Sequence, residues 1–357
     1  MSANLRQVLE GMDGIEFDVI YVGTEDYRRF PAPEIIRISS VLELTWVVSN
    51  KLEGTEYSSY DAVLLCGFEF CWSVRKVVGR VPIILCLDTT PVTARALVTR
   101  EQPSLLAGVK GQILTFIYKA IYGSVFRKLS ASFPLSHWCA QSLVDDFHVP
   151  PERIVPCYTS LDLSHWCPRQ ACTTKDEALR LLFVGNDFKR KGGEELLRLY
   201  SDVLSRECVL TIVSSDPILD GRELPSGVER LKNIPHEDMH ILFKDADVFV
   251  FPSWRDQLAL VLAEAMACGQ AVISRDGGGI GDIVRDGWNG YLMPYDAPMA
   301  DWGERILALA RDREAVCAMG RHSRELALEL FDRKVYGRKV RDTLRAVLAG
   351  ELLPKGM

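Results

Sequence analysis

Residues 248–284 read VFVFPSWRDQLALVLAEAMACGQAVISRDGGGIGDIV. Two short apolar runs, Val248–Phe251 and Ala271–Ser274, flank a helical pattern that extends from about Gln257 to Cys268. Both runs are continuously apolar instead of alternating, which is typical of strands that are buried on both faces. A strand, a helix and a second such strand in this order predict a parallel sheet with helices packed on its two sides.

The same pattern recurs along the rest of the chain. In the first half, apolar runs predict buried strands at Phe17–Val22, Ala62–Cys66, Val81–Leu87 and Ala131–Pro134. In the second half they predict further strands at Arg180–Val184, Val209–Val213 and Val228–Leu231, and a helical pattern dominates residues 300–349. The polar stretch Arg169–Glu177 separates the two halves. We therefore expect an α/β protein with two Rossmann-like domains, residues 1–170 and 178–330.

Composition narrows the class of protein. The chain has 357 residues, with 42 Lys and Arg against 48 Asp and Glu, which gives a net charge of −6 and argues against a nucleic-acid partner. No run approaches the ~20 apolar residues of a membrane span, and Met1–Gly14 lacks the apolar core of a signal peptide. Ten scattered cysteines without a Cys-x-x-Cys pair favour reduced thiols. We expect a cytoplasmic location.

The beginning of the chain departs from the usual order of a doubly wound domain. Leu5, Val8, Leu9 and Met12 form a helical stripe that precedes the first predicted strand. Such domains normally open with a strand whose following turn carries glycines. The N-terminal domain is therefore expected to lack its first strand.

Two carboxylates stand out in the stretch quoted above. Asp256 and Glu264 are eight residues apart, which is roughly 12 Å along a helix, so we expect them to hold opposite ends of an extended ligand. The amides of residues 257–259 are expected to lie free at the start of that helix, where they favour an anion. Gly277, Gly278 and Gly279 follow the second strand and would let the backbone approach a ligand closely.

A cluster of cations follows another predicted strand. Residues 181–193 read LLFVGNDFKRKGG, in which the strand ends at Gly185 and Lys189, Arg190 and Lys191 precede the next helix. Ligands of parallel sheets bind at the carboxyl ends of the strands, and Arg and Lys suit phosphate oxygens. Taken alone, the cluster is equally typical of a solvated surface patch. Together with the two carboxylates and the glycine turn, it predicts a site for a nucleoside diphosphate.

These motifs resemble, in the same order, the donor-binding domain of retaining glycosyltransferases of the GT-B fold, specifically glycosyltransferase family 4, also described as glycosyl transferases group 1. The matching segments are Val184-Gly185, Lys191-Gly192, Pro252-Ser253, Asp256 with Glu264-Ala265-Met266-Ala267, Gly278-Gly279-Ile280 and Asp286-Gly287-Trp288-Asn289-Gly290. A weaker match continues in the first half at Leu135-Ser136, Arg153-Ile154-Val155 and Leu161-Asp162.

The resemblance implies a fold and an activity. The fold would be GT-B, with two Rossmann-like domains that face each other across a cleft and a C-terminal helix, about residues 331–357, that packs back on the N-terminal domain. The activity would be transfer of a hexose, with retention and without a metal ion, from a nucleotide diphosphate sugar to a glycan or lipid-linked acceptor. No cofactor is expected besides the donor.

The resemblance also implies roles for individual residues. Glu264 would accept the ribose hydroxyls, Asp256 would bind hydroxyls of the transferred sugar, and Arg190 with Lys191 would bind the diphosphate. The remaining donor-binding positions would be Gly185, Gln257, Leu258, Ala259, Leu260, Gly278 and Gly279.

The chain departs from the family pattern at several of these positions. Asp256 stands where the family has a longer Glu, Gln257-Leu258-Ala259 replaces Gly-Phe-Gly, and Asn186 replaces an arginine, whose role we assign to Arg190. Many relatives place a histidine near the end of the strand that matches Val81–Leu87, where this chain has Asp88. Asp88 is a candidate for orienting the acceptor or the sugar, and is equally typical of a helix cap.

Two further features allow alternative interpretations. Asp245-Ala246-Asp247 spells the Asp-x-Asp motif of metal-dependent transferases, but it precedes a strand, so we interpret it as a turn and expect no metal site. Residues 102–144 contain no acidic side chain. An apolar helical pattern at about 105–130 is interrupted by four basic residues, Lys110, Lys119, Arg127 and Lys128. This pattern predicts either a buried helix with solvated lysines or a peripheral contact with an anionic membrane at its inner, cytoplasmic face.

Two other functions compete with glycosyl transfer. Gly277-x-Gly279 after a strand is typical of a nicotinamide dehydrogenase, but Asp282 occupies the third glycine position of that fingerprint. A non-catalytic protein that binds nucleotide sugars is the other alternative, supported by the altered loop at 257–259 and by the short N-terminus before the first predicted strand.

Overall fold

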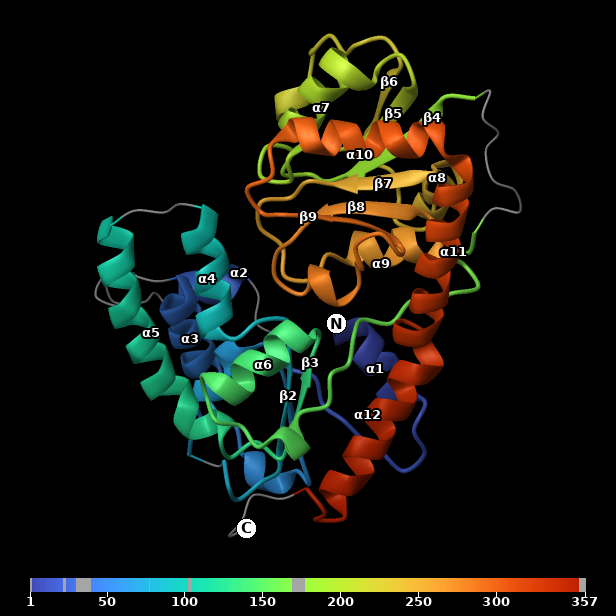
Figure 1. The fold of residues 1–357 in the computed structure, drawn as a ribbon. Helices are drawn as coiled ribbons and strands as arrows, with labels where there is room; N and C mark the ends of the chain where they lie inside the picture. Colours follow the sequence, from blue (N-terminus) through green and yellow to red (C-terminus); the bar gives the residue numbers. More distant parts are fainter. Residues whose placement is uncertain are drawn as a thin grey trace. The chain divides into compact units, whose positions relative to one another are not determined.

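The computed structural model describes residues 2–21, 24–29, 40–76, 78–101, 105–168 and 177–352 (Figure 1). The chain divides into two compact units. Unit 1 comprises residues 1–159 together with 336–357, and unit 2 comprises residues 160–335. This division lies before the boundary expected at residue 170, and most of the expected linker, 169–176, falls outside the described residues.

Unit 1 contains a parallel sheet with the strand order β1-β2-β3 in its described part. The strands are β1 (Val63–Cys66), β2 (Ile83–Leu87) and β3 (Ala131–Pro134). Its helices are α1 (Ser2–Glu10), α2 (Thr24–Arg29), α3 (Ser40–Lys51), η1 (Tyr57–Ser59), η2 (Phe68–Trp72), α4 (Pro91–Glu101), α5 (Leu105–Phe126), α6 (His137–Asp145), η3 (Pro151–Arg153) and most of α12 (Arg333–Leu348). The three strands lie where the apolar runs predict them.

Side chains from successive strand residues of unit 1 enter two separate cores. Ile83, Leu85 and Leu87 of β2 pack with α5, α6 and η2, whereas Ile84 and Cys86 pack with α1 and α12. This alternation follows from the two-residue period of a strand, and it explains why β2 is apolar at every position. The C-terminal helix α12 contributes Tyr336, Val340, Leu344 and Val347 to the second core.

One predicted strand is wrong. Residues 17–21 form no strand, while Val22 lies outside the described residues. Val19, Ile20 and Tyr21 are exposed to solvent. An extended apolar segment becomes a strand only when a neighbouring strand supplies hydrogen-bond partners, and no described segment pairs with this one.

Unit 2 contains a six-stranded parallel sheet with the order β6-β5-β4-β7-β8-β9. Its strands are β4 (Leu179–Val184), β5 (Cys208–Val213), β6 (Val228–Leu231), β7 (Val248–Phe251), β8 (Ala271–Arg275) and β9 (Gly290–Met293). Numbered from β4, this is the doubly wound order 3-2-1-4-5-6 of the Rossmann fold. The apolar runs do not predict β9, where a Cβ at Gly290 would lie 1.8 Å from the carbonyl oxygen of Val272. This short edge strand opens with the glycine that permits its close approach to β8.

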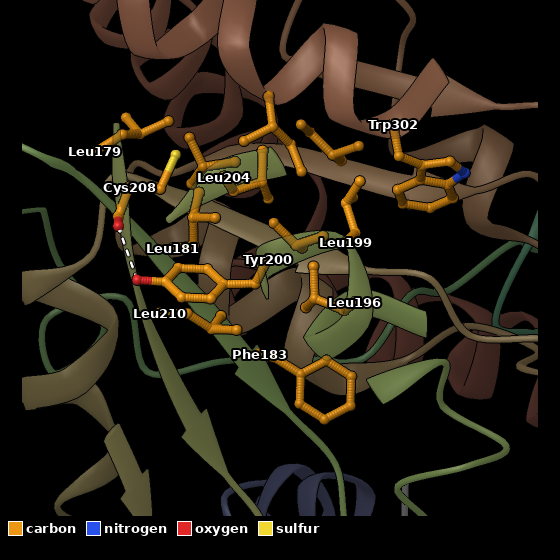
Figure 2. Packing of buried hydrophobic residues seen from close by; sticks show 14 of the residues in the cluster. Leu179, Leu181, Phe183, Leu196, Leu199, Tyr200, Leu204, Cys208, Leu210 and Trp302 are labelled. Carbon is orange, nitrogen blue, oxygen red and sulfur yellow. Dashed lines mark hydrogen bonds between the residues drawn. The ribbon is translucent and has the colours of Figure 1, made fainter. Parts of the chain in front are cut away.

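Helices cover both faces of the unit 2 sheet. They are α7 (Gly193–Leu199), the π-helix η4 (Tyr200–Leu204), η5 (Pro217–Leu219), α8 (Met239–Asp245), α9 (Leu260–Ala267), η6 (Ile280–Asp282), α10 (Met299–Arg311) and α11 (Arg313–Leu330). On one face Leu181 and Phe183 pack with Leu196 of α7 and Trp302 of α10, and Tyr200 donates a hydrogen bond to the carbonyl of Cys208 (Figure 2). The expected helical region at 300–349 is confirmed as α10, α11 and α12.

The state of the cysteines differs from the expectation at one position. Eight described cysteines are free thiols, five of which are Cys66, Cys71, Cys86, Cys139 and Cys157 of unit 1. Cys317, on α11, is disulfide-bonded. Reduced thiols are therefore confirmed for these eight cysteines, and Cys317 is the exception among the described residues.

Candidate functional site

The candidate site lies at the point of the unit 2 sheet where the strand order reverses. β4 and β7 are neighbours there, and their connections leave in opposite directions. Ligands of open parallel sheets bind outside the carboxyl ends of the strands at this switch point. Gly185 follows β4 and Pro252-Ser253 follows β7, so both segments lie where a ligand is expected.

Lys191 and Asp256 form an ion pair at the switch point. The Lys191 Nζ donates to both carboxylate oxygens of Asp256 at 2.8 Å, and the Ser253 hydroxyl donates to Asp256 Oδ2 at 2.5 Å. Lys191 Nζ also lies 4.9 Å from the centroid of the Phe251 ring. Both charged side chains are largely buried, which strengthens their attraction relative to a surface pair. Asp256 therefore holds the lysine that the sequence assigns to a diphosphate.

Arg190 belongs to the same cluster. Its Nε donates to Asp187 Oδ2 at 2.6 Å, which lowers the pKa of Asp187, and its Nη1 donates to the carbonyl of Arg255 at 2.6 Å. Arg190 Nη1 lies 3.8 Å from Asp256 Oδ2. Two cations and two carboxylates thus form one cluster in which the charges balance.

Two glycines allow this cluster to form. A Cβ at Gly185 would lie 3.0 Å from Cγ of Lys191, so the missing side chain leaves room for the lysine stem. Gly192 has φ +78°, and a Cβ there would lie 2.4 Å from the carbonyl oxygen of Pro252. Gly192 therefore brings the turn after β4 directly against the end of β7.

The helix after Asp256 begins later than the sequence pattern predicts. α9 starts at Leu260, so Gln257, Leu258 and Ala259 are loop residues, and the expectation of free helix amides at 257–259 is wrong. The spacing of 12 Å between Asp256 and Glu264, which assumed a continuous helix, does not apply either. Gly278 packs directly on the backbone of Asp256 and Gln257, and this contact favours a loop before α9 over a further helical turn.

The glycine turn after β8 packs against this loop. Gly278 has φ +57°, and a Cβ there would lie 2.5 Å from the carbonyl oxygen of Asp256, while the Gly279 N–H donates to the carbonyl of Gln257 at 2.5 Å. The backbone that these glycines approach is therefore the protein's own loop. The turn continues as a single 3-10 turn, η6.

Glu264 lies on α9 with its carboxylate buried. Its Oε1 lies 2.9 Å from Nε2 of the exposed His236. Burial raises the pKa of Glu264, and the His236 contact opposes that rise. The sequence pattern does not reveal this contact, because the two residues are 28 positions apart.

The loops that follow β5 and β6 are hydrogen-bonded to the turn after β4 and to each other. Ser215 Oγ donates to Oδ1 of Asn233, and Asn186, directly after Gly185, accepts from the Ser215 N–H. Asp216 accepts from the Phe188 N–H at 2.8 Å. These bonds join the carboxyl ends of β4, β5 and β6 into one edge.

Asp88 lies in unit 1, exposed, directly after β2. It does not cap α4, because Thr90 does so: the Thr90 Oγ1 accepts from the Thr93 N–H, and the Thr93 Oγ1 accepts from the Thr90 N–H. The helix-cap interpretation of Asp88 is thus wrong, and its carboxylate accepts instead from the Thr89 hydroxyl. The neighbouring Asp88 charge adds to burial in raising the pKa of Glu69.

Asp245-Ala246-Asp247 forms the predicted turn between α8 and β7. The Asp247 Oδ2 accepts a hydrogen bond from the backbone N–H of Arg180 at 2.9 Å. Its carboxylate therefore ties the amino ends of β4 and β7, at the opposite end of the strands from Lys191.

Comparisons with known proteins agree with this geometry. The family model described as glycosyl transferases group 1 matches residues 169–326. This part of the chain is similar to members of that family. A D-inositol 3-phosphate glycosyltransferase of Thermomonospora curvata is 31% identical over 250 residues, which cover 60% of this chain and 58% of the relative. The chain thus spans little more than half the length of this curated relative.

Solved structures share the fold of most of the chain. Sucrose-phosphate synthase from Thermosynechococcus elongatus superimposes with a TM-score of 0.69 at 19% identity, covering 88% of this chain and 80% of that structure. Anabaena HepE in complex with UDP gives 0.65 at 14% identity, covering 84% and 82%. The expected GT-B class of two Rossmann-like domains is confirmed.

Proposed function

We propose that the protein transfers a hexose, with retention and without a metal ion, from a nucleotide diphosphate sugar to a glycan or lipid-linked acceptor. The observation that carries this proposal is the Lys191–Asp256 pair, joined by Arg190, at the switch point of a group 1 glycosyltransferase domain. A HepE structure in complex with UDP-glucose has the same fold, which supports a donor of this class.

The ion pairs of Lys191 and Arg190 indicate how the diphosphate of a donor would bind. A diphosphate offers Lys191 and Arg190 oxygens that replace those of Asp256 and Asp187. Asp256 then becomes available for hydroxyls of the sugar, and the Glu264 carboxylate accepts the ribose hydroxyls. Because the cations are already held by backbone and carboxylate contacts, little reorganisation accompanies the exchange.

The transfer step needs few protein groups. The bond between the anomeric carbon and the phosphate oxygen breaks as the acceptor oxygen bonds to the same face of that carbon. The acceptor proton passes to the leaving phosphate oxygen, and the nucleoside diphosphate departs. Lys191 and Arg190 stabilise the charge that develops on the diphosphate.

A thermal-shift panel of UDP-, GDP- and ADP-glucose with NAD tests this proposal. We expect one nucleotide sugar to raise the unfolding temperature. EDTA should not change that rise, and NAD should not raise the unfolding temperature at all. A shift with NAD alone would favour the dehydrogenase, although a 3-10 turn follows Gly279 in place of that fingerprint's helix. Stabilisation by a nucleotide sugar without hydrolysis or transfer would favour the non-catalytic alternative.

We further propose that α5 contacts an anionic membrane that carries the acceptor. Ile113, Phe116 and Ala120 are exposed along one stripe of this helix, Phe116 at 76%, and Arg127 and Lys128 are exposed beyond its end. In the described part of the chain no helix is long and apolar enough to cross a membrane. Flotation with vesicles rich in phosphatidylglycerol tests the contact: the wild type should float and Phe116→Asp should remain in the soluble fraction.

A further inference from the structure

A buried arginine lies at the carboxyl end of β8. Arg275 is the last residue of this strand and is 1% exposed. Its Nε donates to the carbonyl of Pro252 at 3.3 Å, and its Nη1 donates to the carbonyl of Tyr295. A buried guanidinium is tolerated where its N–H groups find acceptors, so these two bonds hold the side chain in one place. Arg275 belongs to none of the motifs from which the donor site was predicted.

Three aromatic rings surround the Arg275 guanidinium. Its Cζ lies 3.7 Å from the centroid of the Trp254 ring, 5.4 Å from that of Trp302 and 5.8 Å from that of Tyr295. Trp254 and Tyr295 also meet edge to face, with their centroids 5.6 Å apart. The face of an indole attracts a guanidinium, and the attraction is stronger where both groups are shielded from water. Of the three rings, Trp254 is therefore the one that Arg275 fixes most closely.

Trp254 connects this arginine to the donor site. It follows Ser253 in the loop after β7, and its backbone N–H donates to the carbonyl of Arg190 at 3.0 Å. In return, the Arg190 Nη1 donates to the carbonyl of Arg255 at 2.6 Å. The Trp254 indole N–H donates to Glu195 of α7 at 3.4 Å. The loop after β7 is thus joined to the turn and the helix after β4 through both the backbone and the side chain of Trp254.

Pro252 forms a second connection. Its carbonyl oxygen accepts from Arg275 and is also the atom that a Cβ at Gly192 would strike. Gly192 directly follows Lys191, so the turn that carries this lysine packs on a carbonyl that Arg275 holds. Both cations of the donor site are therefore supported by groups that Arg275 contacts.

We propose that Arg275 is a positioning residue for the diphosphate. It holds Trp254 and Pro252 in place, and these residues in turn hold Arg190 and Lys191 where the phosphate oxygens bind. A misplacement of about 1 Å at a reacting group lowers a rate about 100-fold, so a residue outside the site is able to control it. This inference rests on the proposed function, because it takes a diphosphate as the ligand of the two cations.

Calorimetric titration of the full chain with UDP, GDP and ADP tests this proposal. We expect Arg275→Met to bind the nucleoside diphosphate that the wild type binds about 10-fold more weakly, with unchanged stoichiometry. Trp254→Leu should weaken binding by a similar factor, whereas Trp254→Phe, which keeps a ring face over the guanidinium, should stay within about 3-fold of the wild type. Arg275→Lys keeps the charge without the planar face, so its affinity should fall between those of Arg275→Met and the wild type.

A second buried arginine of unit 2 supplies the matched control. Arg313 is 5% exposed and donates to the carbonyl of Glu177, ahead of the amino end of β4. Arg313→Met removes the same kind of buried cation, so it should lower the unfolding temperature while the affinity for the nucleoside diphosphate stays at the wild-type value. Equal losses of affinity in Arg313→Met and Arg275→Met would show that any loss of stability weakens binding, and would refute the positioning role.

Turnover separates this proposal from the proposed function. With a donor and an acceptor that give transfer, Arg275→Met should lower kcat about 10-fold or more and leave KM for the acceptor unchanged. The positioning role is refuted if Arg275→Met or Trp254→Leu binds the nucleoside diphosphate as tightly as the wild type does, or if the wild type binds none of the three. A wild type that binds a nucleoside diphosphate but transfers no sugar contradicts the proposed function, and the affinities of the variants still decide the role of Arg275.

Discussion

At the scale of single residues, the sequence identifies candidate site residues but does not show which of them contact one another. Arg190, Lys191 and Asp256 follow apolar runs, whereas Glu264 lies inside the helical pattern that comes after one of these runs. The Lys191–Asp256 bond joins residues 65 positions apart, and the register of β4 against β7 creates it. A linear pattern identifies charged groups at strand ends, but only the sheet order determines which of them meet.

Replacing Lys191 by Ala should lower turnover about 100-fold or more, because the diphosphate loses a fixed cation in the transition state. The change also leaves Asp256 without its main partner, so the donor meets an uncompensated carboxylate. Steady-state kinetics with the donor identified by thermal shift measures the effect. Lys189→Ala, an exposed lysine two residues earlier, is the control and should retain nearly full activity. A Lys191→Ala enzyme with the wild-type rate would remove this residue from the mechanism.

Donor binding should weaken on acidification because Glu264 must be ionised to accept ribose hydroxyls. Burial raises its pKa, so the loss should begin at a higher pH than for an ordinary glutamate. Glu264→Gln should bind UDP about tenfold more weakly and lose this dependence. Since the His236 contact lowers that pKa, His236→Ala should move the inflection to higher pH. Calorimetric titration of UDP across pH measures all three, and an unchanged profile in Glu264→Gln would contradict the assignment.

At the scale of elements, predictions succeed where burial alone decides the structure. β2 and β7 are buried at every position and were predicted nearly to the residue. The prediction failed at residues 17–21, where a strand depends on a neighbour, and at the start of α9, where packing of Gly278 on residues 256–257 favours a loop. Tertiary contacts thus decide element boundaries that local hydrophobicity leaves open.

Gly192→Ala should destabilise unit 2 by about 3 kcal/mol or more, since a positive φ and a collision with Pro252 add together. Gly221→Ala is the matched control: its φ is +71°, but no atom lies within 4 Å of the added Cβ. It should cost about 1 kcal/mol from the backbone alone. Urea unfolding monitored by fluorescence gives both values. Equal losses in the two variants would show that the close approach to Pro252 contributes nothing.

At the scale of the whole molecule, unit 1 is built from two segments of the chain that unit 2 separates in the sequence. Unit 1 is closed by α12, which follows the whole of unit 2 in the sequence. Its core therefore depends on contacts between the two ends of the chain, such as those of Leu5 and Val8 with Tyr336 and Val340. The amphipathic pattern of residues 333–348 predicts a helix, but the partner of its apolar face emerges only from the structure.

Leu344→Ala should therefore destabilise unit 1 without affecting the donor site. Leu344 is 6% exposed in the core between α12 and the sheet, and its truncation should cost about 2–4 kcal/mol. Leu348→Ala, on the same helix but 51% exposed, should change stability by less than about 0.5 kcal/mol. Hydrogen exchange read by mass spectrometry should show faster exchange in β2 and β3 of Leu344→Ala, with β4 and β7 unchanged and the thermal shift by UDP retained. Faster exchange in β4 and β7 as well would mean that the two units unfold together, and that α12 stabilises the protein as a whole.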